Sequence, residues 1–251
     1  KFTLIAWTAA FAVRKQEQLH SLRRGLAPAL AVWLAVVGLI AMEPSMSAAL
    51  IVLMLALLVI YAAGARIGHF VALGLLGLPL LLTQIGKVQY QLERLWTFIH
   101  RTGDLSNLGY QIDQALIAFG SGGLLGRGFG HGQQKFGFLP EPHNDFILAM
   151  VGEEWGFVGV AVLVLLFLAI ALIGYRIARQ APDLFGYLLA IGLTNLIALQ
   201  ALLHMAVNLA LIPTTGVTLP FISYGRSSLL VCLFTVGVLI NIARQSGRRA
   251  A

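Results

Sequence analysis

Long uninterrupted apolar stretches alternate with short polar connections along most of the chain. Most of these stretches approach the ~20 apolar residues that a helix needs to cross a bilayer, and they lack the ~10-residue alternation of barrel strands. The pattern therefore predicts an all-α, polytopic transmembrane helical bundle. The predicted spans are residues 1–13, 26–42, 47–63, 68–86, 145–175, 184–211 and 226–243.

The composition supports a membrane protein. Of 251 residues, 59% are hydrophobic and 11% are charged, whereas a soluble domain is about 45–50% apolar and about 25% charged. The single cysteine, Cys232, lies inside an apolar stretch, so neither a disulfide framework nor a thiolate metal site is expected. The start at Lys1 lacks the charged segment and cleavage site of a signal peptide.

The net charge of +7 mainly reports membrane orientation. Ten of the 17 basic residues follow the first, third, fifth and last stretches, which are ends that share one side if seven spans alternate. The positive-inside rule places these ends in the cytoplasm, so no nucleic-acid partner is needed. The ten residues are Arg14, Lys15, Arg23, Arg24, Arg66, Arg176, Arg179, Arg244, Arg248 and Arg249.

The connection at residues 87–144 then faces outward and is too long for an ordinary loop. Residues 90–99 form an amphipathic pattern, and GYQIDQALIAFG at 109–120 forms another apolar run. Both patterns predict interfacial or re-entrant pieces that pack over the bundle. We therefore expect an ordered extracytoplasmic cap within a single domain, residues 1–251.

A glycine-rich stretch, FGSGGLLGRGFGHG, occupies residues 119–132. Its spacing fits no phosphate-binding loop, so most of its glycines are interpreted as a tight turn with close backbone approach. Arg127 and Lys135 beside this turn could offer charge to an anionic headgroup. His131 and His143 lack a matching ligand set, which argues against a structural metal site.

Acidic residues gather where the fifth apolar stretch begins. Asp145 follows a good capping residue, Asn144, so its charge could simply complement the helix dipole. Its clustering with Glu141, His143 and nearby cations favours a base beside an anion-binding site. Glu153 and Glu154 follow roughly 12 Å further along the predicted helix and must face protein or water, with Arg226 as one example of a partner.

Polar residues also interrupt the segment PTTGVTLPFISYGRSS, residues 213–228. Helix capping explains some of them. Non-helical backbone at membrane depth is tolerated where it lines a cavity, so we expect Ser223 and Tyr224 to line one.

Two long ordered runs resemble the signatures of the SEDS family (shape, elongation, division and sporulation), which contains RodA, FtsW and SpoVE. These runs are IAFGSGGLLGRGFGHGQQKFGFLPEPHNDFILAMVGEEWGFVG and LIPTTGVTLPFISYGRSSL. The resemblance covers essentially the whole chain, and TGVTLPFISYG is closer to the FtsW and SpoVE branch. It implies about ten spans, of which roughly three would precede Lys1.

This resemblance implies an inverting peptidoglycan glycosyltransferase. Such an enzyme transfers a growing glycan from its undecaprenyl-pyrophosphate lipid to the 4-hydroxyl of lipid II, and Asp145 matches the acid implied as its general base. The implied setting is the bacterial cytoplasmic membrane with an outward-facing site. Implied partners are a class B penicillin-binding transpeptidase and other divisome or elongasome membrane proteins. No cofactor is assigned, and a divalent cation stays an open alternative.

The predicted substrate-binding residues come from both lines of reasoning. The resemblance implies Lys1, Arg94, Glu141 and His143, and the residues themselves point to Arg127, Lys135, Ser223 and Tyr224.

The chain departs from the family pattern at three places. EPSMS at residues 43–47 stands where an Asp-containing motif is usual, Arg226 replaces a glycine, and His204 stands where asparagine is common. These changes leave room for a non-catalytic divisome scaffold. A lipid II flippase is the other alternative, but alternating access needs polar access from both sides, and the polar residues here crowd outward.

Overall fold

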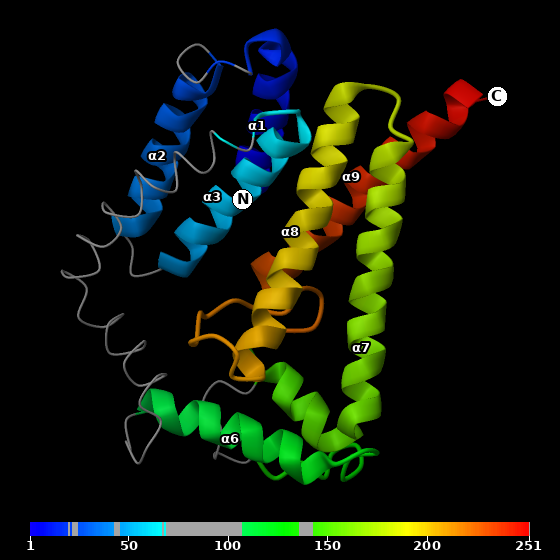
Figure 1. Cartoon of the computed structure of the whole chain (residues 1–251). Helices are drawn as coiled ribbons and strands as arrows, with labels where there is room; N and C mark the ends of the chain where they lie inside the picture. Colours follow the sequence, from blue (N-terminus) through cyan, green and yellow to red (C-terminus); the bar gives the residue numbers. More distant parts are fainter. Residues whose placement is uncertain are drawn as a thin grey trace. The chain divides into compact units, whose positions relative to one another are not determined.

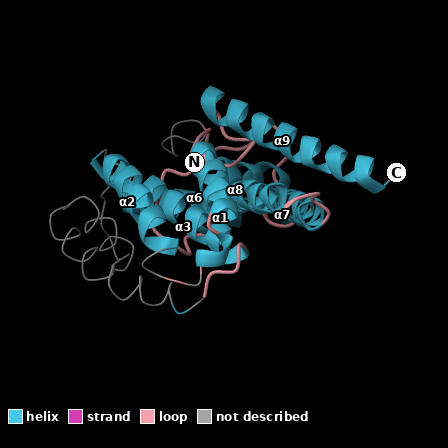
Figure 2. Ribbon diagram, turned by 90° about the horizontal axis from the view of Figure 1, so that it is seen from above, coloured by secondary structure: helices cyan, strands magenta, loops and turns pink. Residues whose placement is uncertain are grey.

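Helices form all the regular structure in the part of the chain that the computed structural model describes, which is residues 1–19, 21, 25–42, 46–66, 68, 107–135 and 143–250. Figure 1 shows them along the sequence, and in Figure 2 only helices and loops appear among these residues. The predicted all-α class is confirmed. In order they are α1 (Phe2–Arg14), η1 (Gln16–Gln18), α2 (Ala27–Met42), α3 (Met46–Ala62), α6 (Asn107–Gly122), α7 (Ile147–Arg179), α8 (Leu184–Asn208) and α9 (Arg226–Ala250).

Six of the seven predicted spans coincide with helices, namely α1, α2, α3, α7, α8 and α9. The last three are long and apolar enough to cross a membrane, and the first three are shorter apolar helices. The chain is a multi-pass membrane protein. The span predicted at 68–86 lies outside the described residues, apart from residue 68.

Part of the long connection is also helical. Helix α6 contains the apolar run GYQIDQALIAFG, for which the pattern predicted an interfacial or re-entrant piece. The amphipathic pattern at 90–99 lies outside the described residues, as does the segment 136–142. The ordered cap is therefore supported at 107–135, and its interfacial position stays a prediction.

The chain divides into two compact units, which are described separately. Unit 1 contains residues 1–77, 169–199 and 230–251, and unit 2 contains residues 78–168 and 200–229. The prediction of one domain is not tested by this division, since α7, α8 and α9 each contribute to both units.

Close contacts order the helices of unit 1. A Cβ on Gly192 of α8 would clash with Ile5 of α1 and with Val59 of α3, so the three helices meet there. Phe2 at the start of α1 packs edge-on against Phe234 of α9, with 4.8 Å between ring centroids.

The same unit brings basic helix ends together. Gly186 at the start of α8 lies beside Ile242 near the end of α9. The end of α9, with Arg244, therefore lies near the turn that joins α7 to α8, where Arg176 and Arg179 precede that turn. This is the side that the charge pattern assigns to the cytoplasm.

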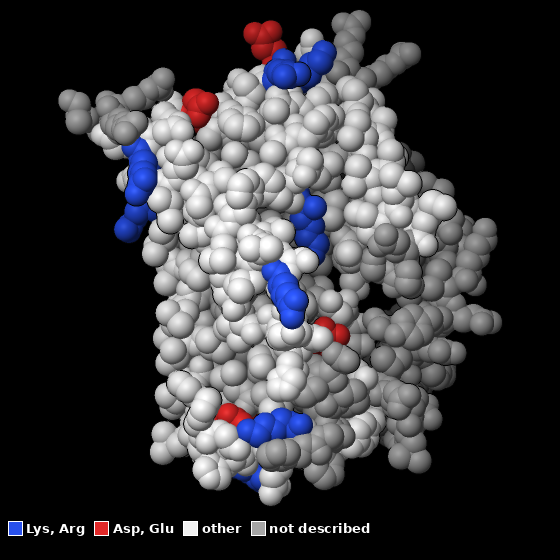
Figure 3. Space-filling model, turned by 180° about the vertical axis from the view of Figure 1, so that it is seen from behind, with Lys and Arg blue, Asp and Glu red and all other residues white. Residues whose placement is uncertain are grey.

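Apolar side chains cover much of the surface. In Figure 3 most atoms on the face shown belong to residues without charge. The exposed apolar residues include Val162, Leu165 and Leu172 on α7 and Leu230 and Leu233 on α9. Such surface on long apolar helices is suited to lipid.

Helix α7 breaks at Gly156. The backbone there has φ +64° and ψ −162°, a conformation that essentially only glycine adopts. A short segment, 147–155, therefore precedes a long one, 157–179, and the ribbon changes direction between them (Figure 1). The prediction of one continuous span at 145–175 is wrong in this respect, because a helix does not continue straight through positive φ.

The break frees four backbone groups, and the glycine loop (residues 123–135) pairs with all of them. In an unbroken helix, residues 157 and 158 would donate to the carbonyls four residues earlier. Here two loop carbonyls and two loop N–H groups replace those partners, as surroundings of low polarity require. The hydrogen bonds join Phe157 N–H to Gly123 O (2.9 Å), Val158 N–H to Leu124 O (3.1 Å), Arg127 N–H to Glu153 O (3.0 Å) and Gly128 N–H to Glu154 O (3.1 Å).

This arrangement leaves no room for side chains at the closest approach. A Cβ on Gly126 would overlap the Glu154 carbonyl, and a Cβ on Gly156 would overlap the backbone N of Gly126. The interpretation of these glycines as a close-packed turn is confirmed at Gly126.

Gly156→Ala is expected to destabilise the protein by about 1–3 kcal/mol from backbone strain alone. The clash with the glycine loop adds to that cost, because the loop's hydrogen bonds prevent it from moving away. Gly237→Ala in α9 is the matched control, since a Cβ there meets nothing within 4 Å and alanine favours a helix. Thermal unfolding in detergent would measure both, and equal melting temperatures would contradict the role assigned to Gly156.

Candidate active site

Asp145 lies two residues before α7, in a turn whose backbone is held by other segments of unit 2. Three consecutive carbonyls of this turn each accept one hydrogen bond. The donors belong to the end of α8 and to the segment 209–225, so distant parts of the chain position the turn. The bonds run from Tyr224 N–H to His143 O (2.9 Å), from Ser223 Oγ to Asn144 O (2.7 Å) and from Asn208 Nδ2 to Asp145 O (2.9 Å).

Asn208 also caps helix α7 from outside. Its side chain is fully buried, and its Oδ1 accepts a hydrogen bond from Ala149 N–H in the first turn of α7 (3.1 Å). Its Nδ2 donates to His204 O (2.9 Å) as well as to Asp145 O. Helix N-termini leave N–H groups without α-helical partners, and Ala149 N–H is shared between Asn208 Oδ1 and Phe146 O (3.0 Å).

Asn208 was missed in the sequence, although a signal was present. It is an amide in the last turn of a mainly apolar helix, and polar residues in such helices often bridge to neighbouring helices in membrane proteins.

The Asp145 carboxylate lies beside the backbone of Gly216. A Cβ on Gly216 would be 4.0 Å from Asp145 Oδ2, and this glycine has φ +67°. The neighbouring backbone is anchored to α8, because His204 Nδ1 is 2.8 Å from Val217 O. Since a carbonyl only accepts, Nδ1 carries the proton. The carboxylate therefore sits against a segment that is itself held in place.

Asn208→Ala is expected to lower stability by about 1–3 kcal/mol, because it removes the three hydrogen bonds of a buried side chain, to Ala149 N–H, Asp145 O and His204 O. It should also lower activity, because the turn that carries Asp145 loses one of the three hydrogen bonds to its carbonyls, the one from Asn208 Nδ2 to Asp145 O. Asn241→Ala, an exposed position on α9, is the matched control. Unfolding and turnover would be measured on the same samples, and a variant as stable and as active as Asn241→Ala would contradict the capping role.

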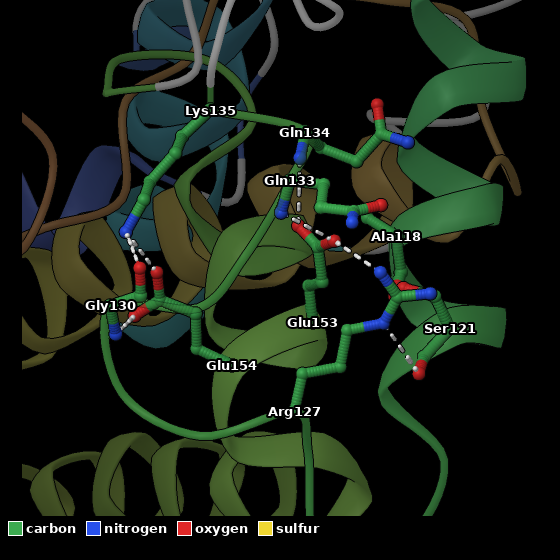
Figure 4. Close-up of polar contacts among 9 residues, drawn as sticks. All are labelled: Ala118, Ser121, Arg127, Gly130, Gln133, Gln134, Lys135, Glu153 and Glu154. Atoms are coloured by element: carbon green, nitrogen blue, oxygen red, sulfur yellow. Dashed lines mark hydrogen bonds and ion pairs between the residues drawn. The ribbon is translucent and has the colours of Figure 1, made fainter.

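Glu153 and Glu154 form a second polar cluster, where the short segment of α7 ends (Figure 4). Glu153 is 1% exposed. Its Oε1 accepts from Gln133 N–H (2.9 Å) and its Oε2 from Gln134 N–H (3.1 Å), with Arg127 Nη1 3.8 Å from Oε1. This buried carboxylate is therefore both paired with a cation and hydrogen-bonded, as burial requires.

Glu154 holds the same loop from the other side. Its Oε1 accepts from Lys135 Nζ (2.7 Å) and its Oε2 from Gly130 N–H (3.0 Å). Lys135 Nζ also donates to Gly130 O (2.8 Å). The two carboxylates thus fix the glycine loop, through backbone N–H groups and through both of the cations that it carries.

This arrangement changes the interpretation of four predicted residues. The sequence suggested Arg226 as a partner for one of the acids, whereas Glu153 pairs with Arg127 and Glu154 with Lys135. Glu153 and Glu154 also end a short segment before the break, and do not lie deeper along a continuous span. Substrate binding by Arg127 and Lys135 stays a prediction, although both side chains contact carboxylates of the protein.

The remaining predicted residues fall into three groups. His143, Ser223 and Tyr224 lie in or against the turn that carries Asp145. Tyr224 is 69% exposed, whereas Ser223 is buried. The Ser223 hydroxyl holds the turn by donating to Asn144 O, and it also accepts from Leu219 N–H (2.8 Å). Lys1 belongs to unit 1. Arg94 and Glu141 lie outside the described residues, so their roles stay predictions.

Comparison with known proteins assigns the family. The profile of the FtsW, RodA and SpoVE family, described as cell cycle proteins, matches residues 1–248. The chain belongs to this family.

Curated members of the FtsW/RodA/SpoVE family are similar over nearly the whole chain. Stage V sporulation protein E of Bacillus subtilis is 42% identical over 246 residues, which is 98% of this chain and 67% of that protein. A probable peptidoglycan glycosyltransferase FtsW of Trichlorobacter lovleyi is 40% identical over 243 residues, 97% of this chain and 64% of that protein. The chain thus spans about two thirds of their length.

Solved structures of family members share the fold. One chain of a peptidoglycan synthase complex, described as coordinating polymerization and crosslinking, matches with a TM-score of 0.75 and 27% identity over 97% of this chain and 70% of that chain. The rod shape determining protein RodA of Thermus thermophilus matches with a TM-score of 0.61 and 26% identity over 97% of this chain and 65% of that chain. The predicted family is confirmed, including its FtsW and SpoVE branch, whose members are the more similar in sequence.

Proposed function

We propose that this chain carries the catalytic part of a peptidoglycan glycosyltransferase that polymerises lipid II, with Asp145 as general base. The observation that carries the proposal is the turn at residues 143–145, whose three carbonyls are all held by distant donors. A catalytic group must be held close to its productive geometry, and loops seldom provide this without such support. The name of the FtsW relative agrees with this activity.

The proposed reaction makes one bond and breaks one. The 4-hydroxyl oxygen of lipid II attacks the anomeric carbon of the growing glycan, and the bond from that carbon to the undecaprenyl-pyrophosphate oxygen breaks, with inversion. The Asp145 carboxylate takes the hydroxyl proton, and the pyrophosphate leaves with its charge. Proton removal by a positioned base contributes typically about 10²–10⁴-fold to rate.

The residues around Asp145 differ in what they offer a substrate. Tyr224 and His143 are exposed beside the held turn and are suited to contact sugar hydroxyls. Ser223 supports the turn. Arg127 and Lys135 support the glycine loop, and substrate binding by Lys1 and Arg94 stays an implication of the family resemblance.

The proposal also includes a setting and a partner. The basic helix ends support a cytoplasmic-membrane protein with this site on the outer side. A class B penicillin-binding transpeptidase is the proposed partner, because a structural relative belongs to a complex that couples polymerization with crosslinking.

Polymerisation of lipid II by the purified full-length protein tests the proposal. Glycan chains that a muramidase digests would support it. The flippase alternative predicts movement of the lipid II headgroup across a liposome without polymer. The scaffold alternative predicts neither, and either of these two results would contradict the proposal.

A further inference from the structure

Large apolar side chains crowd the surface where α7 breaks. One comes from the short segment of α7 and one from the long segment. The other three come from the glycine loop. All are more than half exposed, although each is large enough to fill a core position. This group, called the knuckle below, consists of Leu124 (73% exposed), Leu125 (80%), Phe129 (80%), Trp155 (55%) and Phe157 (66%).

The knuckle is presented by a rigid backbone. Four hydrogen bonds join the glycine loop to α7 across the break, and Glu153 and Glu154 hold the rest of the loop. Phe129 and Trp155 also meet edge to face, with 6.4 Å between centroids and 78° between ring planes. A mobile loop could fold its apolar side chains inward, but this loop is held with them outward.

The length of α7 gives the depth of the knuckle in a membrane. Arg176 is the first charged residue in the long segment that begins at 157. About 20 helical residues at 1.5 Å each cover the ~30 Å hydrocarbon core. Counting back 20 positions from Arg176 reaches Gly156, so the opposite boundary of the bilayer falls at the break.

The knuckle is also continuous with lipid-facing surface. Phe157 and Val158 begin the exposed apolar face of α7, which continues through Val162 and Leu165. Trp and other large aromatic side chains are favoured at the membrane–water boundary, where one part of the surface is apolar and the next is polar. The adjoining polar part is the loop itself, with exposed His131 and Gln133.

We propose that the knuckle is an anchor in the membrane interface, packed among lipid headgroups and the first carbons of the acyl chains. Its occupant is lipid, and neither a second copy of this chain nor a protein partner is needed to cover it. The anchor fixes the height of the glycine loop, and this loop leads through residues 136–142 to Asp145. The proposal does not depend on the glycosyltransferase reaction.

Nitroxide labels on the full-length protein in liposomes test this anchor. Single cysteines would be introduced as Leu125→Cys and Phe129→Cys, with Cys232 and any other cysteine replaced. Both sites are exposed, so labelling leaves the core intact. Leu165→Cys is the reference for the bilayer interior and Gln133→Cys, an exposed polar position on the same loop, is the matched reference for water.

Collisions with oxygen, which concentrates in lipid, are compared with collisions with a water-soluble nickel chelate. The expected oxygen-to-nickel ratio at 125 and 129 is higher than at 133 and lower than at 165. A ratio equal to that at 133 would overturn the proposal, because the knuckle would be in water. Low collision rates with both reagents would also overturn it, because protein would then cover the knuckle. A ratio equal to that at 165 would overturn it too, because the knuckle would then lie in the bilayer interior.

Discussion

Asp145→Asn is expected to lower the rate of lipid II polymerisation by about 10²–10⁴-fold, the usual contribution of a positioned general base. Asparagine has nearly the shape of aspartate but cannot take the hydroxyl proton. The fold should tolerate it, because Asn208 holds residue 145 through its backbone carbonyl. Glycan formation by the purified full-length protein would be followed over time, and thermal unfolding would be measured on the same preparation.

Asp113→Asn is the matched control for this prediction. Asp113 is an exposed residue on α6, and its replacement removes the same charge from the same unit. Its rate should stay near that of the unmodified protein. A similarly high rate from Asp145→Asn would remove Asp145 as the base, whereas polymer from the unmodified protein would still support the glycosyltransferase itself.

Glu153→Ala is expected to destabilise the protein by about 1–3 kcal/mol, the usual cost of leaving a buried hydrogen-bond donor without its acceptor, while Arg127, whose side chain is 39% exposed, contributes little. The substitution leaves the N–H groups of Gln133 and Gln134 without this acceptor, and Arg127 without its counter-charge. Glu154→Ala should cost less, because the side chains of Glu154 and Lys135 are both partly exposed and exposed pairs contribute little. Thermal unfolding of both variants in detergent should show a larger loss of stability for Glu153→Ala than for Glu154→Ala.

Trypsin provides a local test of the same cluster. The glycine loop contains two cleavage sites, after Arg127 and Lys135, and cleavage there requires the loop to open. Glu153→Ala should speed cleavage at both sites, whereas Glu17→Ala, an exposed change on η1, should not. If Glu153→Ala were no less stable than Glu154→Ala and were cut no faster, the two carboxylates would not hold this loop.

The helices were the most predictable part of the structure. Whether a segment of the chain enters the membrane depends mainly on its own apolar residues, so hydropathy alone located α1, α2, α3 and α8 to within three residues. It also located the start of α9, which continues to Ala250, seven residues beyond the predicted end. The run at 109–120 was recognised in the same way and lies in α6. These predictions needed no knowledge of which segments meet.

The break in α7 was not predictable in the same way. Gly156 is one of several glycines along a strongly apolar stretch, and glycine in a membrane helix usually permits close packing without a break. What makes the break tolerable is the glycine loop, which supplies four hydrogen-bonding groups from about 30 residues earlier in the chain. No local pattern contains that information.

The candidate site was predictable only as far as it depends on residue type and on position along the chain. A carboxylate beside a predicted helix N-terminus identified Asp145, and residue type alone singled out Glu153 and Glu154 as groups that need partners. Their partners depend on which segments of the chain meet in the fold. Arg127 and Lys135 were predicted to bind substrate, whereas they pair with these two carboxylates. Asn208, 59 positions from the N–H group that it caps, was missed altogether.

By itself, the sequence determined the helical membrane class and the kinds of side chain available for chemistry, and it predicts the orientation of the spans, because transfer into lipid and charge are properties of each residue or short segment. Only the tertiary structure decided which carboxylates pair with cations, where α7 turns and how the Asp145 turn is held. Those outcomes depend on hydrogen bonds between segments that are distant in the chain, and each such bond exists only when the fold has brought both of its ends together.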